Sequence, residues 1–220
     1  GWLGIGAGPV MAGAELFTMK ITGRGGHGAA PHLTNDPIVA AAQIVGALQT
    51  ITARNVPPLQ AAVVSVTTIR SGTAFNVIPQ QAELTGTIRT FEPAVRARVL
   101  ERFGEIATGI GKAMGCDVDI ESKRVTPAVI NATSIAVQAQ DVARRILPES
   151  ELDTTGYTTM GAEDMAFMQE KIPGCYLFVG SSNAARHLDY GHHHPKFDFD
   201  EQALPRAVAL MAGIAADLLR

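Results

Sequence analysis

The chain has 220 residues, a hydrophobic fraction of 46% and a formal net charge of −3 at pH 7. The hydrophobic fraction excludes an intrinsically disordered chain, because buried apolar side chains offset the entropy that is lost on ordering. The slightly acidic balance argues against a nucleic-acid-binding protein, and the length suits two small domains.

Cysteines and apolar segments bear on the compartment of the protein. Cys116 and Cys175 lie far apart and suggest no disulfide framework, so we expect a reduced, cytoplasmic protein. The apolar start, residues 1–8, lacks a basic region and is interrupted by glycines, so we expect no signal peptide. No run of about 18 uncharged apolar residues occurs, and we expect no membrane span.

The first part of the chain alternates strand and helix patterns in a recognisable order. These patterns predict a strand at 15–22, a helix from Pro37 to about Ala53, strands at 62–69 and 83–91, a helix from Pro93 closed by Gly115, and a strand at 116–121. Asp36 supplies an N-cap acceptor for the first helix. The order βαββαβ is that of a ferredoxin-like unit. We therefore predict an α/β chain with a ferredoxin-like domain at residues 14–125, after a connecting segment at residues 1–13.

The rest of the chain has a different organisation. Helices are expected at 131–147, at 162–171 and after Asp200, and an apolar strand is expected at 175–180. The strand shows no alternation, which is typical of a strand buried on both faces of a parallel sheet. The last helix has an apolar stripe, formed by Leu204, Val208, Met211, Ala215 and Leu218. One strand and three helices cannot make a covered parallel sheet, so we expect residues 126–220 to be the C-terminal part of a larger α/β domain.

A glycine-rich loop at residues 23–32 contains His27. A phosphate-binding loop is excluded, because no Gly-Lys-Ser/Thr follows and Pro31 blocks an immediate helix. His27 could stabilise charge at a neighbouring site, or it could be a turn histidine that bonds a carbonyl.

A second histidine group comprises His187 and the run His192–His194. In an extended segment His193 faces away from its two neighbours, so the run cannot form a three-histidine site by itself, although one member can be a metal ligand. The spacing of His187 and Asp189 could instead give a self-contained surface metal site, which we consider the weaker hypothesis. Glu163 and Asp164 could orient a ligand or satisfy a helix N-terminus.

Two further residues could hold a substrate. Arg89 lies on the polar face of its strand with Thr85 and Thr87, where a guanidinium can bind a carboxylate with two hydrogen bonds or remain solvated. Asn76 lies in the loop at residues 72–79, where its amide could fix the turn or reach a substrate.

Six segments taken together resemble a known family. They are GRGGHGAAPH at 23–32, NDPI at 35–38, FNVIP at 75–79, GTIRT at 86–90, AEDM at 162–165 and HHPKFDF at 193–199. In content and order they resemble the aminoacylase-type metallopeptidases, in particular the amidohydrolase branch that includes hippurate hydrolase and indole-acetyl-amino-acid hydrolases.

The resemblance implies a fold, an activity and roles for single residues. It implies a metal-binding α/β catalytic domain with an inserted ferredoxin-like lid that forms a homodimer, and hydrolysis of N-acyl amino acids or small peptides with two Zn or Mn ions. His27 matches the lid histidine that reaches a partner subunit's site and stabilises the oxyanion. Asn76 and Arg89 match residues that hold the substrate carboxylate, and His193 matches the last metal ligand.

The family's other metal motifs have no counterpart in these 220 residues. No early Cys-Gly-His-Asp or His-x-Asp motif precedes residue 14, and no two glutamates are adjacent. Together with the absence of an initial Met, this predicts a chain that lacks the first half of its catalytic domain. Such a chain would bind the metals poorly or not at all and would be inactive alone. The alternatives are a non-catalytic dimerisation module built on the lid and, from fold analogy only, a small-molecule sensor.

Overall fold

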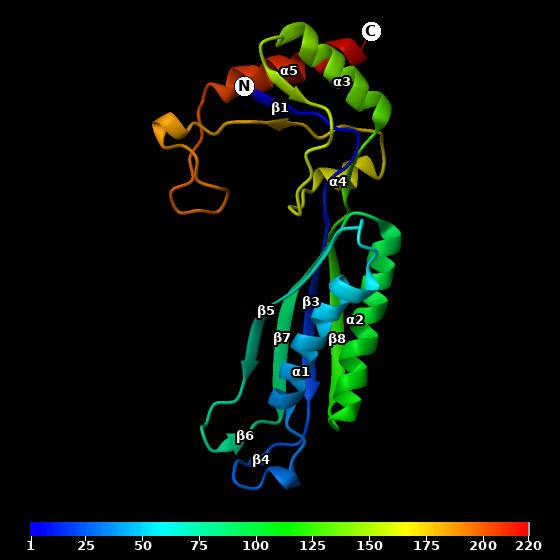
Figure 1. Ribbon diagram of the computed structural model, residues 1–220, viewed down its shortest axis with the longest axis vertical. Coiled ribbons are helices and arrows are strands. Elements are labelled where there is room, and N and C mark those ends of the chain that lie inside the picture. The colour runs from blue at the N-terminus through cyan, green and yellow to red at the C-terminus, as the bar shows by residue number, and fades with distance from the viewer. Residues whose placement is uncertain (220) are drawn as a thin grey trace. The chain divides into compact units, whose positions relative to one another are not determined.

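The computed structural model describes residues 1–219, which form two compact units (Figure 1). The ferredoxin-like unit comprises Ala12–Ala128 with Met160–Glu163. The flanking unit comprises Gly1–Met11, Val129–Thr159 and the chain from Asp164 onward. No helix among the described residues is both long and apolar enough to cross a membrane.

The ferredoxin-like unit has the predicted βαββαβ order. Its elements are β3 (Gly13–Thr22), α1 (Pro37–Thr50), β5 (Ala62–Ser71), β7 (Gln81–Thr90), α2 (Pro93–Ala113) and β8 (Asp117–Thr126). The four strands form an antiparallel sheet in the order β5-β7-β3-β8. The prediction of a ferredoxin-like α/β fold is therefore confirmed.

The helix boundaries follow the local signals in the sequence. The Asp36 carboxylate accepts a hydrogen bond from the Ile38 N–H at 2.8 Å and caps α1, with Pro37 as the first helical residue. The helical path continues beyond α1 as a π-helical turn, Ile51–Asn55. Gly115 follows α2 with φ +68°, a left-handed conformation that glycine adopts at little cost.

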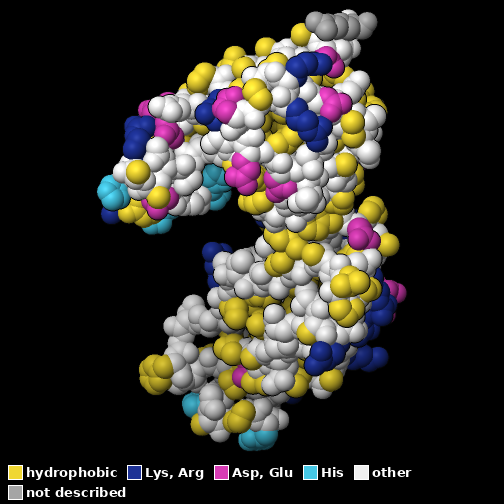
Figure 2. Space-filling view, turned by 45° about the horizontal axis from the view of Figure 1, so that its top comes forward, with side chains coloured by type: hydrophobic (Ala, Val, Ile, Leu, Met, Phe, Trp, Pro, Cys, Tyr) yellow, Lys and Arg dark blue, Asp and Glu magenta, His cyan; other side chains and the backbone are white. Residues whose placement is uncertain are grey.

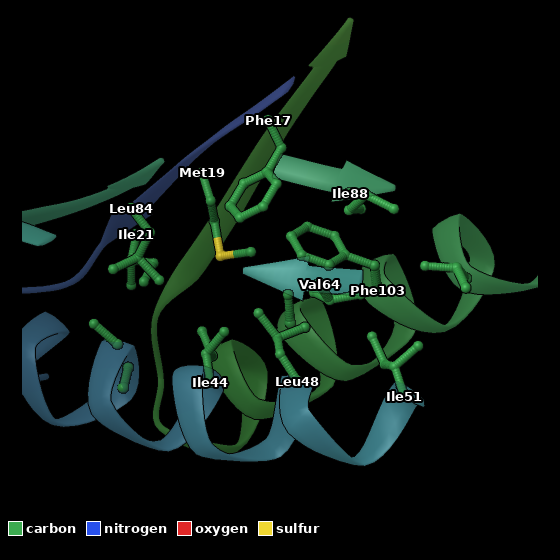
Figure 3. Close-up of a cluster of buried hydrophobic side chains, with 14 of the residues drawn as sticks. Phe17, Met19, Ile21, Ile44, Leu48, Ile51, Val64, Leu84, Ile88 and Phe103 are labelled. Atoms are coloured by element: carbon green, nitrogen blue, oxygen red, sulfur yellow. The ribbon is translucent and has the colours of Figure 1, made fainter. Parts of the chain in front are cut away.

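Both helices pack on one face of the sheet and enclose the main core (Figure 3). Strand alternation sends Leu84 and Ile88 of β7 into this core, together with Met19 of β3. The rings of Phe17 and Phe103 join β3 to α2, with centroids 4.6 Å apart. The opposite face of the sheet carries the polar residues of the strands, as the alternation in β7 predicts.

One ion pair lies at the edge of this core. Glu15 on β3 is on the helix-facing side of the sheet with its side chain 4% exposed, and it accepts a hydrogen bond from Arg96 Nε of α2 at 2.6 Å. Arg96 remains 38% exposed, so its charge is partly hydrated. A carboxylate in this position needs its cation, because a buried charge without a partner is costly.

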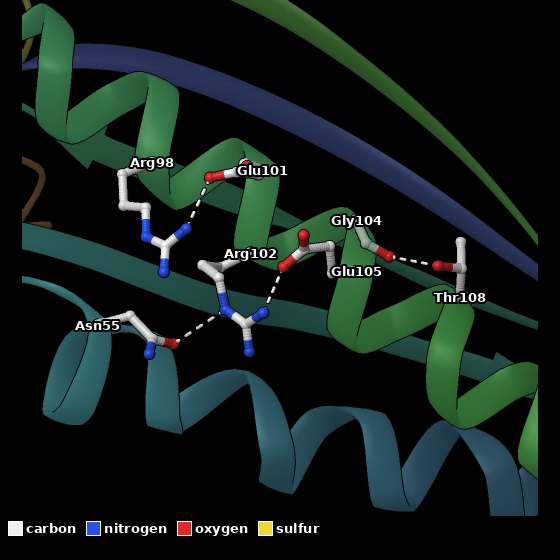
Figure 4. A network of polar contacts seen from close by, with 7 residues as sticks. All are labelled: Asn55, Arg98, Glu101, Arg102, Gly104, Glu105 and Thr108. Carbon is white, nitrogen blue, oxygen red and sulfur yellow. Dashed lines mark hydrogen bonds and ion pairs between the residues drawn. The ribbon is translucent and has the colours of Figure 1, made fainter.

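The outer face of α2 is covered by ion pairs (Figure 4). Arg98 pairs with Glu101 at 2.7 Å, and Arg102 pairs with Glu105 one turn further along. Arg102 Nε also approaches Asn55 Oδ1 at 3.4 Å, which links α2 to the end of the first helical segment.

The outer face of α1 is uncharged. Between Pro37 and Thr50 the helix contains no Asp, Glu, Lys or Arg, and Ile38 and Val39 are about half exposed. The edge strands differ in the same way. β5 is uncharged from Ala62 to Ile69, whereas β8 carries five charged residues, which are Asp117, Asp119, Glu121, Lys123 and Arg124.

The flanking unit is built around two small sheets and two longer helices. Its elements are β1 (Trp2–Gly4), β2 (Gly8–Met11), β9 (Val129–Asn131), α3 (Thr133–Ile146), β10 (Glu151–Asp153), α4 (Met165–Gln169), β11 (Phe178–Val179), a 3₁₀ turn (Ala184–Arg186) and α5 (Ala203–Leu218). β1 pairs in parallel with β10 and antiparallel with β11, and β2 pairs with β9. The first eleven residues, interpreted from sequence as part of a connecting segment, thus contain two strands, β1 and β2.

Two sequence expectations for this unit are corrected. The apolar segment 175–180 is not a doubly buried parallel strand, because only Phe178–Val179 pair, antiparallel to β1, and both are half-buried. The apolar stripe noted on the last helix, α5, is not its buried face: Leu204, Val208, Met211 and Leu218 are exposed, and the residue that enters the core is Leu210. Since α5 has apolar residues all round its circumference, periodicity alone does not identify its inner face.

Replacing Arg96 with Met should lower the free energy of unfolding by about 1–3 kcal/mol, because the Glu15 carboxylate would stay buried without a partner. Arg98→Met on the exposed face of α2 is the matched control, and its effect should stay within about 0.5 kcal/mol. Urea denaturation measures both variants. Equal effects would show that the Glu15–Arg96 pair does not stabilise the packing of α2 on the sheet.

Candidate functional site

A short two-stranded ribbon carries His27 and Asn76. In this tip ribbon, β4 (Gly26–His27) pairs antiparallel with β6 (Val77–Ile78), and His27 lies opposite Val77. The Gly28 N–H donates to the Asn76 carbonyl at 2.8 Å. The fold therefore brings together two residues that lie 49 positions apart in the sequence.

The glycines around His27 allow the two backbones of the ribbon to approach each other. A Cβ on Gly25 would lie 2.6 Å from the Ile78 carbonyl oxygen, and a Cβ on Gly28 would lie 3.0 Å from the Asn76 carbonyl oxygen. The glycine-rich sequence thus serves close backbone packing.

The His27 side chain is exposed, and one of its ring nitrogens is engaged. Nδ1 accepts a hydrogen bond from the Ala29 N–H at 3.0 Å. The surroundings are apolar, since Phe75 is fully exposed and Leu33 and Val77 are more than half exposed. Figure 2 shows histidine and hydrophobic side chains together at this end of the unit.

Arg89 lies on the open face of β7 with an oriented guanidinium. Its Nε donates to Thr87 Oγ1 at 3.1 Å, and the Thr87 hydroxyl donates to the Glu15 carbonyl at 3.0 Å. Within residues 1–219 its two terminal nitrogens have no hydrogen bond or ion pair. They form a fork that fits a carboxylate.

The tip ribbon lies at one end of the four-stranded sheet (Figure 1), and the strand register places Arg89 at the other end. Thr22, which leads into the ribbon, pairs with Gln81 at the start of β7, whereas Arg89 pairs with Ala14 at the other end of β3. At about 3.3 Å per residue, the path from Gln81 to Arg89 is about 26 Å. The structure therefore joins His27 to Asn76 and separates both from Arg89.

The histidine run lies in an exposed loop of the flanking unit, and its three rings have different surroundings. His192 contacts the Phe197 ring edge-on, with centroids 5.0 Å apart, and His194 stacks on Tyr190 at 4.4 Å. His193 has φ +66°, so the backbone turns at this residue and is not extended as the sequence interpretation assumed. The three rings have separate contacts because of this turn.

Asp200 closes the loop that carries the histidine run. Its carboxylate accepts hydrogen bonds from the Asn183 amide at 2.6 Å, the Arg186 guanidinium at 3.0 Å and the Gln202 N–H at 3.1 Å. These bonds, first of all that from Asn183, hold the pKa of Asp200 below its ordinary value. From the sequence, Asp200 is only the residue before a helix, because a loop closure over 17 residues has no local signal.

Glu163 and Asp164 precede α4. Asp164 occupies the N-cap position, but its side chain accepts no cap hydrogen bond from the helix. Glu163 is half-buried and Asp164 is exposed. Of the two roles considered from sequence, side-chain capping is not observed for Asp164.

The described residues do not fit a metal centre by themselves. Among residues 1–219 no group of three or more His, Cys, Asp or Glu side chains gathers as a metal site would require. The cysteines are unsuited as ligands, because burial raises the pKa of Cys175 to about 11, and burial, with nearby Asp36 and Asp117, raises that of Cys116. His193 alone could supply a single imidazole.

Comparisons with known proteins show which proteins the chain is similar to. The peptidase dimerisation domain model of the M20 family matches residues 12–114. The chain is 37% identical over 225 residues to N-acetylcysteine deacetylase of Bacillus subtilis, covering 100% of this chain and 56% of the relative. It is 32% identical over 213 residues to hippurate hydrolase of Campylobacter jejuni, covering 97% and 54%.

A solved structure is similar over the same extent. It is a dinuclear metal-binding peptidase of the M20 family from Bacillus subtilis, with a TM-score of 0.79 and 33% identity, covering 99% of this chain and 53% of that one. The chain thus spans about half the length of the relatives that it matches.

Replacing Asp200 with Asn should loosen the loop that carries the histidine run. The asparagine side chain is uncharged and has one accepting oxygen, so it cannot accept the three hydrogen bonds that the two carboxylate oxygens of Asp200 accept. The reciprocal backbone bonds between Asn183 and Leu188 report on this closure, and their protection from hydrogen exchange should fall. In the unsubstituted chain the folded pKa of Asp200 is the lower one, so its contribution is complete above about pH 4 and is lost as the pH falls through the folded pKa.

Asp189→Asn, an exposed substitution in the same loop, is the matched control and should leave the protection unchanged. Unchanged protection in Asp200→Asn at neutral pH would show that Asp200 does not hold the loop closed.

Proposed function

Because the chain belongs to the M20 family of peptidases and amidohydrolases and carries its dimerisation domain, we propose that it is part of a metal-dependent amidohydrolase that cleaves N-acyl amino acids. The observation that carries this proposal is the distribution of polar groups on the ferredoxin-like unit. A histidine and an amide share one ribbon, and an oriented guanidinium faces outward from the same sheet. The relative named for N-acetylcysteine acts on a compound of this class.

Each of these groups has a role that its chemistry suits. The terminal nitrogens of Arg89 would bind the substrate carboxylate, with Asn76 as a further donor. His27 would stabilise the negative charge that develops on the acyl oxygen during attack on the amide.

The separation along β7 favours a site that is shared between two copies. A path of about 26 Å along the strand is far longer than an N-acyl amino acid, so His27 and Arg89 of one chain cannot contact the same molecule. We assign His27 and Asn76 of one copy and Arg89 of the other to each substrate. A homodimer is then required for activity.

The uncharged flank formed by α1 and β5 is the proposed dimer surface. Ile38 and Val39 are exposed on α1, and β5 offers an uncharged strand edge. The opposite flank carries the ion pairs of α2 and the charges of β8, which discourage edge pairing. A two-fold axis would place equal surfaces against each other.

The metal ions of the proposed enzyme need more donors than residues 1–219 gather in one place. The similar peptidase from Bacillus subtilis is described as dinuclear, and a pair of Zn or Mn ions would suit the proposed reaction. We assign one ligand to His193 and a supporting role at the ligands to Glu163 and Asp164. We assign the remaining ligands and the general base to polypeptide beyond these 220 residues. Residues 14–125 would be the lid, and residues 126–220 would belong to the catalytic domain.

Two free cysteines suit the cytoplasm, where we place the protein.

A non-catalytic dimerisation module is the second candidate, and the uncharged flank is the observation that favours it. The two candidates differ in whether substitution of His27 or Arg89 changes an enzymatic activity. In a non-catalytic module such substitutions change no activity.

Val39→Glu should weaken the proposed dimer, because it places a charge on the uncharged flank at a position that is about half exposed in one chain. Ala97→Glu on the exposed face of α2 is the matched control. Sedimentation equilibrium should give twice 23.2 kDa for the original chain and the control, and a lower mass for Val39→Glu. Equal masses for both variants would exclude this flank as the interface.

The activity is tested in a chimera in which these 220 residues replace the aligned part of the Bacillus subtilis N-acetylcysteine deacetylase. With Zn²⁺ or Mn²⁺ the chimera should hydrolyse N-acetylcysteine. His27→Ala should lower kcat by about 10²–10³, the usual loss for one oxyanion donor. Arg89→Ala should mainly raise KM.

Mixing the two impaired variants, assayed at a substrate concentration well below the raised KM, distinguishes a shared site from a site within one chain. A heterodimer of His27→Ala and Arg89→Ala has one intact shared site, so activity should return on mixing, and a site within one chain would give no recovery. A folded, metal-loaded chimera without turnover would contradict the proposed hydrolysis. The 220-residue chain alone should show no turnover with added metal.

A further inference from the structure

His27 lies in a loop where three successive backbone N–H groups are engaged. The Gly28 N–H donates to the Asn76 carbonyl at 2.8 Å, and the Ala30 N–H donates to the His27 carbonyl at 2.8 Å. Between them, the Ala29 N–H donates to His27 Nδ1 at 3.0 Å. The loop therefore holds the imidazole at one defined nitrogen.

We infer that the backbone amide of Ala29 fixes His27 as the neutral tautomer that carries its proton on Nε2. A neutral imidazole has one donor and one acceptor nitrogen, and a nitrogen that accepts from an amide N–H carries no proton itself. Nε2 then points away from the loop as an uncharged hydrogen-bond donor. The tautomer follows from the loop geometry, and its use toward a substrate rests on the proposed function.

The loop around Ala29 is well anchored, which keeps its amide directed at the ring. On one side, the Gly28 backbone lies against Asn76 so closely that an added Cβ would be 3.0 Å from the carbonyl oxygen. On the other side, a 3₁₀ turn at Pro31–Leu33 is closed by the Thr34 N–H, which donates to the Pro31 carbonyl at 3.0 Å. Ala29 is thus a positioning residue that acts through its backbone N–H. Its role cannot be inferred from its side chain, because the methyl group takes no part in the hydrogen bond.

The tautomer decides what His27 can do. A donor at Nε2 can stabilise the oxygen of an amide carbonyl as negative charge develops on it, without itself changing protonation state. Proton abstraction would need an unprotonated Nε2, and the lone pair of this ring is directed at Ala29. The Nε2–H tautomer therefore suits His27 to donate to a developing oxyanion, the role given to it under the proposed function, and does not suit it to abstract a proton.

The test uses nitrogen NMR of the ¹⁵N-labelled 220-residue chain, recorded over a series of rising pH values until the His27 ring signals no longer change. Long-range ¹H–¹⁵N spectra distinguish protonated from unprotonated ring nitrogens, and His27→Gln identifies the signals of His27. Nδ1 should be unprotonated, and a coupling across the hydrogen bond should connect it to the Ala29 nitrogen. Ala29→Gly keeps the amide and should preserve both features, whereas Ala29→Pro removes the N–H and should give a mixture of tautomers.

The inference is overturned if Nδ1 carries the proton in the original chain, or if a folded Ala29→Pro keeps the Nε2–H tautomer unchanged. Should Ala29→Pro not fold, the coupling in the original chain decides, and its absence overturns the inference. No substrate takes part in these measurements. A chimera without hydrolytic activity would therefore remove the proposed function and leave the tautomer as found.

Discussion

Strand β7 constrains the rest of the ferredoxin-like unit, because one of its faces packs in the core and the other presents polar side chains to the open side of the sheet. Leu84 and Ile88 alternate into the core beneath the helices, and this burial fixes the strand in register with β3 and β5. A shift by one residue would expose both side chains and bury Arg89. The packing energy of the core therefore also determines that Arg89 faces outward and that it lies a full strand length from the tip ribbon.

The long elements could be predicted from sequence because their signals are local. Alternation identified the strands of the ferredoxin-like unit, and Asp36 with Pro37 marked the start of α1 as the structure has it. The tip ribbon could not be predicted, because β4 and β6 have two residues each and no periodicity. Its hydrogen bonds join segments that are far apart in sequence. The proximity of His27 and Asn76 is thus a property of the folded chain alone.

The sequence also did not predict which charged side chain is buried or which face of a helix packs against the core. Glu15 lies in a strand where its neighbours alternate regularly, and only its contact with Arg96 explains a carboxylate on the helix-facing side. On α5 several apolar faces compete, and the contact with α3 selects the face that contains Leu210. The histidine run illustrates a third limit, because the turn at His193 replaces the extended backbone on which its side-chain directions were inferred.

The polar groups lie at the two ends of one sheet, and for this reason the proposed reaction depends on dimer formation. A four-stranded sheet with a packed core cannot shorten, so groups at its opposite ends can meet on one small molecule only if two chains contribute. A donor that is delivered by a partner chain has to be oriented before the substrate arrives, since no further contact from its own chain can adjust it there. The Ala29 amide meets this requirement, because it sets the direction of His27 Nε2–H within the ribbon itself.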